Sequence, residues 1–270
     1  MQITDNVFVV TGGGNGIGRE VVLALLARGA RVAALDLRAE SLEEVAEAAN
    51  APEGHLTLHA VDVSSVDEVT RAFAEVMSEH GRVDGLLNVA GIIQHFVPIA
   101  DLDLAEMHKV MGVNFWGVVH TTKAVLPHLL TRPEACIINV SSMGGFIPVP
   151  GQSAYGASKA AVKLFTEGLY AEVRDTDVAV TIVYPGAIAT DITTNSGVAT
   201  PQQAAADDKG SSFPTTSASD AAAQIIDAVE KGPYRMTIGR DAAMLDRLSR
   251  LAPQRATEMI AKKMAGLLQK

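Results

Sequence analysis

Short apolar runs alternate with longer segments in which apolar residues recur every three or four positions. The short runs predict buried strands near residues 7–10, 31–35, 56–61, 85–89, 136–140, 178–183 and 235–238. The longer segments predict helices near residues 17–28, 41–49, 66–79, 104–130, 154–174 and 218–230. Continuous β-branched runs are typical of strands covered on both faces. The order predicts an α/β fold, a Rossmann-like doubly wound sheet of about seven parallel strands with helices on both faces.

Two segments depart from this alternation. Residues 191–217 are rich in Thr, Ser, Ala and Asp. A loop of this length is expected to be a flap over a bound substrate, with a poorly ordered insertion as the alternative. Residues 241–270 have a helical pattern that breaks at Pro253, and they form a predicted C-terminal helical tail. Because no linker or repeat separates these segments from the rest, we predict one domain over residues 1–270.

The composition is typical of a globular protein, with 48% hydrophobic and 20% charged residues. The net charge of −9 argues against nucleic acid as a partner, because phosphate affinity depends on Lys and Arg. The single cysteine, Cys136, excludes an internal disulfide and suits a reducing compartment. No apolar run approaches the roughly 18 residues of a membrane span, and no leader segment precedes the first strand. We therefore expect a cytoplasmic protein without a membrane span.

Charge is distributed unevenly along the chain. The tail over residues 241–270 holds six basic and three acidic residues, a net charge of +3. The total of −9 therefore leaves −12 for the rest of the chain. We expect the tail to dock onto an acidic neighbouring subunit, with an anionic membrane surface as the alternative.

A glycine-rich turn, Thr11-Gly-Gly-Gly-Asn-Gly-Ile-Gly18, follows the first predicted strand and opens the first helix. Gly12 permits a tight turn, Gly16 lets the backbone approach a pyrophosphate, and Gly18 allows close helix–strand packing. The helix N-terminus adds N–H groups and partial positive charge. An ordinary glycine-rich turn is the alternative, but the position between strand and helix indicates a dinucleotide site.

Two acidic residues at strand ends bear on which dinucleotide binds. Asp36 ends the second predicted strand, where a carboxylate accepts hydrogen bonds from ribose hydroxyls and repels a 2′-phosphate. This favours NAD over NADP, although Arg38 nearby offsets part of the repulsion. Asp62 and Val63 end the third strand, where they are placed to meet an adenine, with helix capping by Asp62 as the alternative.

Tyr155 and Lys159 are four residues apart in a predicted helix, so their side chains share one face. A free phenol has a pKa of about 10, too high for a base at neutral pH. A nearby ammonium and an oxidised nicotinamide both favour the phenolate, which makes Tyr155 a candidate general acid/base. Ser142, just after the fifth strand, can bind the substrate oxygen. A Ser–His–Asp nucleophile does not fit, because Ser142 lacks a Gly-x-Ser-x-Gly context and no His follows His128.

Taken in order, these residues resemble the single-domain branch of the short-chain dehydrogenase/reductase family. The resemblance covers about residues 4–240 and rests on Thr11-Gly-x-x-x-Gly-x-Gly18, Asp62, Asn88-Val-Ala-Gly91, Asn114, Ser142, Tyr155-x-x-x-Lys159 and Pro185-Gly186 through Thr190. Val89 departs from the family pattern, which usually has a second Asn or a similar polar residue there. The resemblance implies an oxidoreductase that transfers hydride between NAD(H) and a secondary alcohol or ketone, assembled as a homotetramer or homodimer.

The resemblance also implies a role for each matching position. Tyr155 is the implied general acid/base, Lys159 binds the nicotinamide ribose and lowers the tyrosine pKa, and Ser142 orients the substrate oxygen. Asn114 is implied to interrupt its helix and hold a water on a proton path from Lys159; a solvent-facing amide is the alternative. The implied cofactor contacts are Gly12, Asn15, Gly16, Ile17 and Gly18 at the pyrophosphate, Asn88, Ala90 and Gly91 at the adenosine and ribose, and Pro185, Gly186, Ile188 and Thr190 toward the nicotinamide.

Substrate identity depends on less regular segments. Together with Ser142 and Tyr155, the expected substrate contacts are Gln94, His95, Met143 and Gln152. A solvent-facing loop position is equally compatible with His95. No metal site is expected, because the histidines lack a ligand pattern. Two other functions stay open: reduction of a 3-oxoacyl thioester, which normally goes with NADP, and NAD binding without turnover in a sensor.

Overall fold

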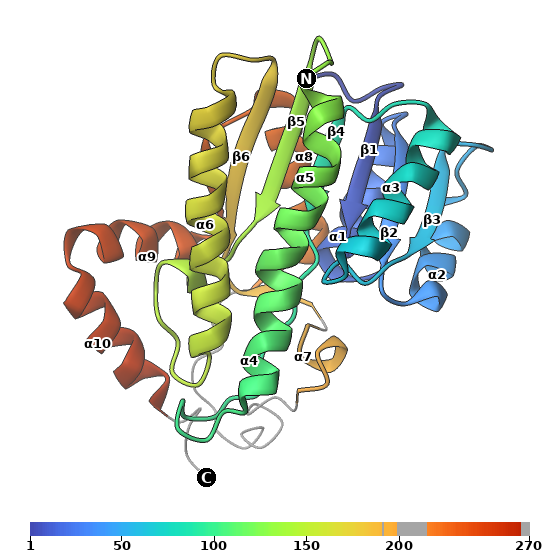
Figure 1. The fold of residues 1–270 in the computed structure, drawn as a ribbon. Coiled ribbons are helices and arrows are strands. Elements are labelled where there is room, and N and C mark those ends of the chain that lie inside the picture. The colour runs from blue at the N-terminus through green and yellow to red at the C-terminus, as the bar shows by residue number, and fades with distance from the viewer. Residues whose placement is uncertain (191, 199–214, 266–270) are drawn as a thin grey trace.

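The computed structural model describes residues 1–190, 192–198 and 215–265. Seven strands form one sheet in the order β3-β2-β1-β4-β5-β6-β9, and all six neighbouring pairs are parallel (Figure 1). Their bounds are β1 (Val7–Thr11), β2 (Arg31–Asp36), β3 (Leu56–Ala60), β4 (Gly85–Asn88), β5 (Ala135–Val140), β6 (Val178–Pro185) and β9 (Arg235–Ile238). The predicted fold class is confirmed.

Helices cover both faces of the sheet (Figure 1). One layer consists of α1 (Gly16–Ala27), α2 (Ala39–Ala49) and α8 (Ala218–Lys231). The opposite layer consists of α3 (Val66–His80), α5 (Gly117–Leu129) and α6 (Ser153–Val173). Alternate strand residues explain the two layers, because successive side chains of a strand point to opposite faces. Val10 of β1 belongs to the first cluster, whereas Val9 belongs to the second.

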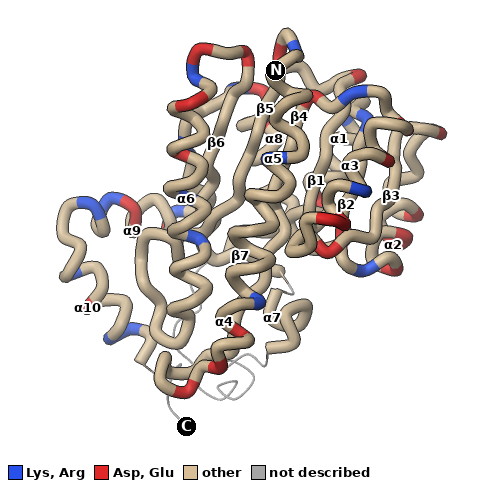
Figure 2. The backbone as a smooth tube through the Cα atoms, in the orientation of Figure 1, with Lys and Arg blue, Asp and Glu red and all other residues tan. Residues whose placement is uncertain are grey.

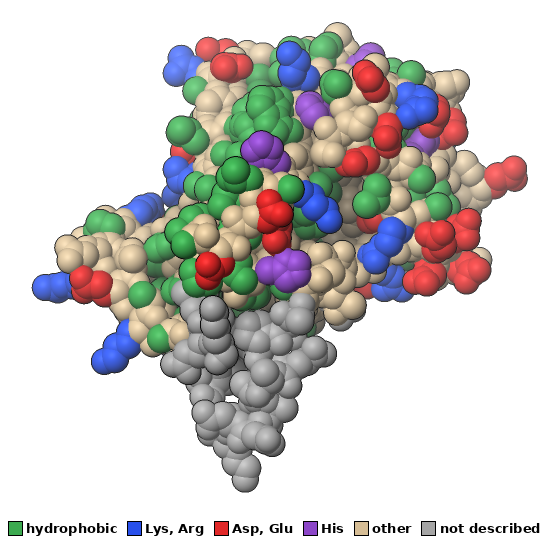
Figure 3. Space-filling model, turned by 60° about the horizontal axis from the view of Figure 1, so that its bottom comes forward, with side chains coloured by type: hydrophobic (Ala, Val, Ile, Leu, Met, Phe, Trp, Pro, Cys, Tyr) green, Lys and Arg blue, Asp and Glu red, His purple; other side chains and the backbone are tan. Residues whose placement is uncertain are grey.

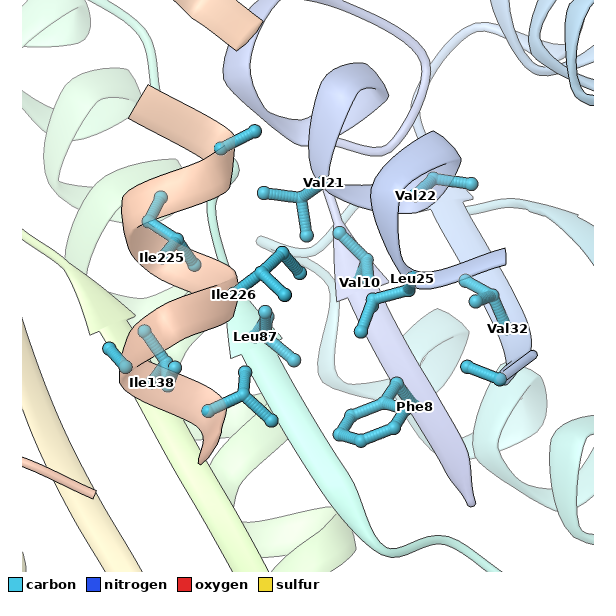
Figure 4. Packing of buried hydrophobic residues seen from close by; sticks show 14 of the residues in the cluster. Phe8, Val10, Val21, Val22, Leu25, Val32, Leu87, Ile138, Ile225 and Ile226 are labelled. Atoms are coloured by element: carbon cyan, nitrogen blue, oxygen red, sulfur yellow. The ribbon is translucent and has the colours of Figure 1, made fainter. Parts of the chain in front are cut away.

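The first cluster shows how close-packed this core is (Figure 4). Leu87 and Ile138 of the sheet meet Leu25 of α1 and Ile226 of α8, and all four are at most 1% exposed. A fully buried aliphatic side chain contributes about 1.5–3 kcal/mol of transfer free energy, so this layer fixes the strands against each other. The carboxyl ends of the strands are therefore held at a fixed edge of the sheet.

The segment over residues 104–130 is not the single helix that the periodicity predicts. It divides into α4 (Leu104–Met111), the π-helical turn η1 (Gly112–Trp116) and α5. Asn114 in this turn is fully buried, and its amide bonds both the N–H (2.8 Å) and the carbonyl (2.9 Å) of Ile92. The Asn114 side chain thus forms with the Ile92 backbone the two hydrogen bonds that a neighbouring strand would form. The helix backbone widens to a π-helical turn at this position.

The C-terminal segment packs onto its own subunit. Its helices α9 (Arg240–Leu251) and α10 (Pro253–Lys263) bury Leu245 and Ile260 against Ile147, just beyond the short helix η2 (Met143–Gly145). Lys and Arg are spread along both helices (Figure 2), and the Asp246 carboxylate forms ion pairs with Arg235 at 2.7 Å and Arg250 at 2.6 Å. Leu245 and Ile260 are thus buried within the chain, whereas Met244, Leu251 and Met259 stay exposed. Docking of the basic tail onto a neighbouring subunit stays a prediction.

Two further expectations concern segments and spans. Of the expected flap over residues 191–217, residues 191 and 199–214 lie outside the described residues. Described parts of it form α7 (Ile192–Asn195) and β8 (Thr216–Ser217), which pairs with β7 (Ile188–Ala189). In the described ranges, no helix has both the length and the apolarity needed to cross a bilayer.

Candidate active site

A cleft of about 380 Å³ opens at the carboxyl ends of the strands. It lies where β1 and β4 are neighbours, although their connections run to opposite sides of the sheet. In doubly wound sheets this switch point is where ligands bind, because the loops diverge there and leave a crevice. Most cleft residues lie at or just after the ends of β1, β2, β3, β4, β5 and β6, and the others lie on α1, α4, η1 and α6 or at α7.

The glycine-rich turn lines one end of this cleft, and the backbone geometry requires its glycines. Gly12 has a φ of +68°, and a Cβ there would lie 2.8 Å from the Ala90 Cα atom. A Cβ on Gly18 would overlap the carbonyl oxygen of Gly12. Asn15 adds a side-chain nitrogen that is buried and, within the described residues, has no hydrogen-bond partner. A cradle without Cβ atoms beside a helix N-terminus and an unused donor fits a pyrophosphate.

Asp36 and Arg38 lie at the neighbouring strand end and both line the cleft. The Asp36 carboxylate accepts the N–H groups of Gly14 (3.0 Å) and Arg38 (3.2 Å). The Arg38 guanidinium donates to the Asn195 side-chain oxygen at 3.0 Å, so it is turned toward α7. The residues of this end therefore present a carboxylate and a guanidinium side by side.

Asp62 lies in the turn between β3 and α3. It lines the cleft with Val63, and its Oδ1 atom accepts the N–H of Ser64 at 2.8 Å. This bond forms the turn that leads into α3, whose N-cap is Ser65. The helix-capping alternative for Asp62 is therefore wrong, whereas its expected contact with an adenine stays a prediction.

Asn88 does not reach the cleft, contrary to the prediction for it. It is 2% exposed, and its amide donates to Asn139 of β5 at 2.9 Å and accepts from Thr121 of α5 at 2.8 Å. A buried amide needs such partners, because an unpaired polar group in the core is costly. Asn88 therefore ties β4 to β5 and α5. The other predicted cofactor residues all line the cleft: Gly12, Asn15, Gly16, Ile17, Gly18, Asp36, Asp62, Val63, Ala90, Gly91, Tyr155, Lys159, Pro185, Gly186, Ile188 and Thr190.

Ser142, Tyr155 and Lys159 meet at the other end of the cleft. α6 presents Tyr155 and Lys159 one turn apart, and Ser142 follows β5. Burial raises the pKa of Tyr155, and a hydrogen bond with Ser142 offsets part of that rise. The phenol is thus held beside a hydroxyl group in a partly buried position that lines the cleft.

Lys159 does not act on the Tyr155 pKa here in the way that the spacing predicts. Its ammonium donates to the Val140 carbonyl at 3.0 Å, and burial lowers its pKa to about 8. Desolvation disfavours the charged form of a buried amine, which explains the direction of the shift. A Cβ on Gly91 would lie 3.1 Å from the same nitrogen, so a larger residue there would displace the ammonium by a few tenths of an ångström.

Asn114 is close to these residues without lining the cleft. Its nitrogen donates to the Ser158 hydroxyl at 2.9 Å, and that hydroxyl donates to the Tyr155 carbonyl at 2.7 Å. The interruption of its helix, which the resemblance implied, is present as η1. Its side-chain amide bonds protein groups, so it anchors α6 and the segment at Ile92.

Four residues expected to contact substrate lie elsewhere. Gln94 and Gln152 are buried and bonded to protein groups, because the loops that carry them fold inward. His95 is exposed and pairs with Glu106 at 2.7 Å. Met143 packs against the cluster beneath α9 and α10. Whether a loop side chain is buried depends on contacts with distant segments. The local sequence therefore did not predict where these four side chains lie.

Asp241 at the start of α9 was not predicted. Its carboxylate accepts the Ala187 N–H at 2.8 Å, and a Cβ on Gly186 would overlap it. It therefore holds the loop from Pro185 to Thr190, which lines the cleft. The only sequence signal is an acidic residue in the first turn of a helix, which occurs in many helices without such a role.

We expect Asp241→Ala to weaken dinucleotide binding about tenfold, because a hydrogen bond to a charged group contributes about 1.5–3 kcal/mol. Titration calorimetry with NAD⁺ measures the effect. Asp227→Ala is the matched control, since Asp227 forms an exposed pair with Lys231 on α8 and should leave binding unchanged. Equal affinities of both variants would contradict this role for Asp241.

Comparisons with known proteins agree with this site. The short chain dehydrogenase family model matches residues 6–200. The "Putative oxidoreductase SadH" of Mycobacterium tuberculosis is 35% identical over 259 residues, 94% of each chain. The 2-(R)-hydroxypropyl-CoM dehydrogenase of Xanthobacter autotrophicus is 36% identical over 195 residues, 69% of this chain and 76% of that protein. A short chain dehydrogenase of Burkholderia cenocepacia, solved in complex with NADP, has a TM-score of 0.80 at 27% identity over 96% of this chain and 99% of its own. The chain therefore belongs to the short-chain dehydrogenase/reductase family of oxidoreductases.

Proposed function

We propose that the protein transfers a hydride between NAD(H) and a secondary alcohol or ketone, with Tyr155 as general acid/base. The observation that carries the proposal is the meeting of Ser142, Tyr155 and Lys159 at one end of a cleft whose other end is the glycine cradle. A relative named for a 2-hydroxypropyl compound supports a secondary alcohol as the substrate class.

Each polar side chain of this group has a distinct task. The bound nicotinamide supplies the hydride acceptor or donor. Ser142 donates a hydrogen bond to the substrate oxygen and keeps it within reach of the Tyr155 hydroxyl. Tyr155 takes the hydroxyl proton during oxidation and returns it during reduction. Lys159 holds the nicotinamide ribose, and its positive charge favours the phenolate once it turns from the Val140 carbonyl.

The preference for NAD rests on Asp36. Its carboxylate lines the cleft, and a 2′-phosphate placed there would be repelled. The Burkholderia cenocepacia relative was solved with NADP, so family membership does not fix the choice of dinucleotide. The proposed preference for NAD therefore rests on the residues of this chain. Arg38 is a competing charge at this strand end, because its guanidinium bonds Asn195 and both residues line the cleft.

Asp36→Ser should raise turnover with NADP⁺ relative to NAD⁺ by at least about tenfold, because removing the carboxylate removes the repulsion. Steady-state assays with both dinucleotides and a panel of secondary alcohols measure the ratio. Asp67→Ser provides a control, since Asp67 lies in the first turn of α3 and is not a cleft residue. Wild-type activity with NADPH alone would overturn the proposed preference.

The pH dependence should differ between the two directions. Burial raises the Tyr155 pKa, so below that pKa the phenol keeps its proton and is a poor base. Oxidation should therefore accelerate by up to about tenfold per pH unit toward alkaline pH, whereas reduction uses the protonated phenol and should fall there. Profiles of kcat/KM in both directions measure this, and an oxidation rate that peaks near pH 6 would contradict it.

We further propose a cytoplasmic homo-oligomer, with a tetramer favoured. Apolar side chains lie exposed on η1 and α6, among them Trp116, Leu164 and Tyr170. Hydrophobic side chains gather on part of the molecular face shown in Figure 3. A second copy of the chain would cover such a face, and light scattering tests the assembly state.

A further inference from the structure

The helix that carries Tyr155 is capped from a distant segment. Tyr155 is the third residue of α6, so its N–H is one of the groups that a helix leaves unbonded at its start. Within the described residues, Gln152 at the N-cap position makes no side-chain bond to that first turn. The Tyr155 N–H instead donates to the side-chain oxygen of Gln94 at 2.9 Å, 61 residues earlier in the chain.

Both ends of the Gln94 amide are engaged, which fixes its orientation. Its nitrogen donates to the Gly151 carbonyl at 3.0 Å, while its oxygen accepts from Tyr155. The backbone carbonyl of Gln94 accepts a further hydrogen bond from the Gln152 side-chain nitrogen at 2.7 Å. Gln94 is 0% exposed, so these bonds form in a site without competing water.

The segment that carries Gln94 also forms part of the cleft wall. Ile92 and Ile93 precede it and line the cleft. Asn114 holds Ile92 from η1, and the Ile93 N–H donates to the Ser196 hydroxyl at 3.0 Å. Residues 92–94 therefore connect η1, the segment after α7 and the start of α6.

We propose that Gln94 is a positioning residue that sets the start of α6 and thereby the phenol of Tyr155 relative to Ser142. The inference rests on the proposed function of Tyr155. Gln94 touches no ligand in the cleft, since it is not a cleft residue. Its effect should therefore fall on turnover rather than on binding of the dinucleotide.

Two variants separate positioning from packing. Gln94→Met keeps the volume and loses both bonds. Gln94→Glu keeps the oxygen that accepts from Tyr155 but sets a second oxygen against the Gly151 carbonyl. Only the protonated acid can donate to that carbonyl, so this variant should work at low pH and fail as the carboxyl ionises.

We expect Gln94→Met to lower kcat by about tenfold to 100-fold, with the dissociation constant for NAD⁺ within about twofold of the wild type. Gln94→Glu should approach wild-type kcat at low pH and lose it in a new ionisation that the wild type and Gln94→Met lack. Ile226→Val is the control, because it removes one buried methyl group from α8, away from the cleft, and should lower the melting temperature without changing kcat.

A Gln94→Met protein that melts earlier but keeps its kcat overturns the proposal. A pH profile of kcat for Gln94→Glu that follows the wild-type profile also overturns it. This second test remains valid if Gln94→Met does not fold. Hydrogen exchange of the peptide that contains Tyr155 needs no activity: faster exchange in Gln94→Met than in Ile226→Val supports the cap, and equal exchange overturns it. Absence of wild-type turnover would count against the proposed function alone.

Discussion

Tyr155→Phe is expected to lower turnover in both directions by about 10²–10⁴-fold, the usual contribution of a positioned general acid/base. The change removes one oxygen atom and leaves the ring that α6 places in the cleft. Binding of NAD⁺ should stay within about twofold, because the cradle from Gly12 to Gly18 is unchanged. Stopped-flow assays and calorimetry measure the two effects on the same protein.

Tyr170→Phe is the control for that experiment. Tyr170 lies on the same helix but is 41% exposed and outside the cleft, so its variant should keep full turnover. Near-normal turnover of Tyr155→Phe would remove Tyr155 from the reaction. Loss of NAD⁺ binding would instead indicate a misfolded cleft.

Lys159→Met is expected to lower turnover by about 100-fold and to change how stability depends on pH. Burial lowers the pKa of Lys159 from 10.5 to about 8. Below about pH 8 both folded and unfolded states hold the proton, so the folded protein carries a buried charge at full cost. Between about pH 8 and 10.5 the unfolded state binds more protons than the folded state, so the wild type gains stability with rising pH.

The methionine variant lacks this gain. Its free energy of unfolding, relative to the wild type, should therefore fall by about 3 kcal/mol as the pH rises from 8 to 10.5. Urea titrations at several pH values measure the difference. Lys163→Met is the control, because Lys163 pairs with Glu167 one turn further along α6 and is not a cleft residue. A difference that does not vary with pH would contradict the burial of a charged Lys159.

The regular parts of the fold were predictable because their causes are local. Apolar runs predicted the seven strands, and the turn at Gly12–Gly18 predicted one end of the cleft. The interruption at Asn114 was implied only by the resemblance. Its cause is a hydrogen bond with the distant backbone of Ile92, and the sequence of the helix itself does not show that contact. Periodicity alone predicts one continuous helix there.

The substrate residues were harder to predict for a related reason. Gln94 and Gln152 are polar residues near the site in sequence, yet the loops turn their amides toward protein backbone. Asp241 contributes to the same site from 54 residues beyond Ala187. Such contacts depend on how distant segments meet, and no pattern within either segment reports it.

Hydride transfer between a secondary alcohol and a dinucleotide is the reaction proposed for this cleft. The decisive experiment incubates the protein with NAD⁺ and secondary alcohols that carry deuterium on the carbinol carbon. Mass spectrometry then measures deuterium in the dinucleotide. The proposed mechanism predicts reduced dinucleotide that carries one deuterium per ketone formed, and about 10²–10⁴-fold slower formation of it with Tyr155→Phe. Tight NAD⁺ binding without deuterium transfer from any alcohol in the panel would contradict it.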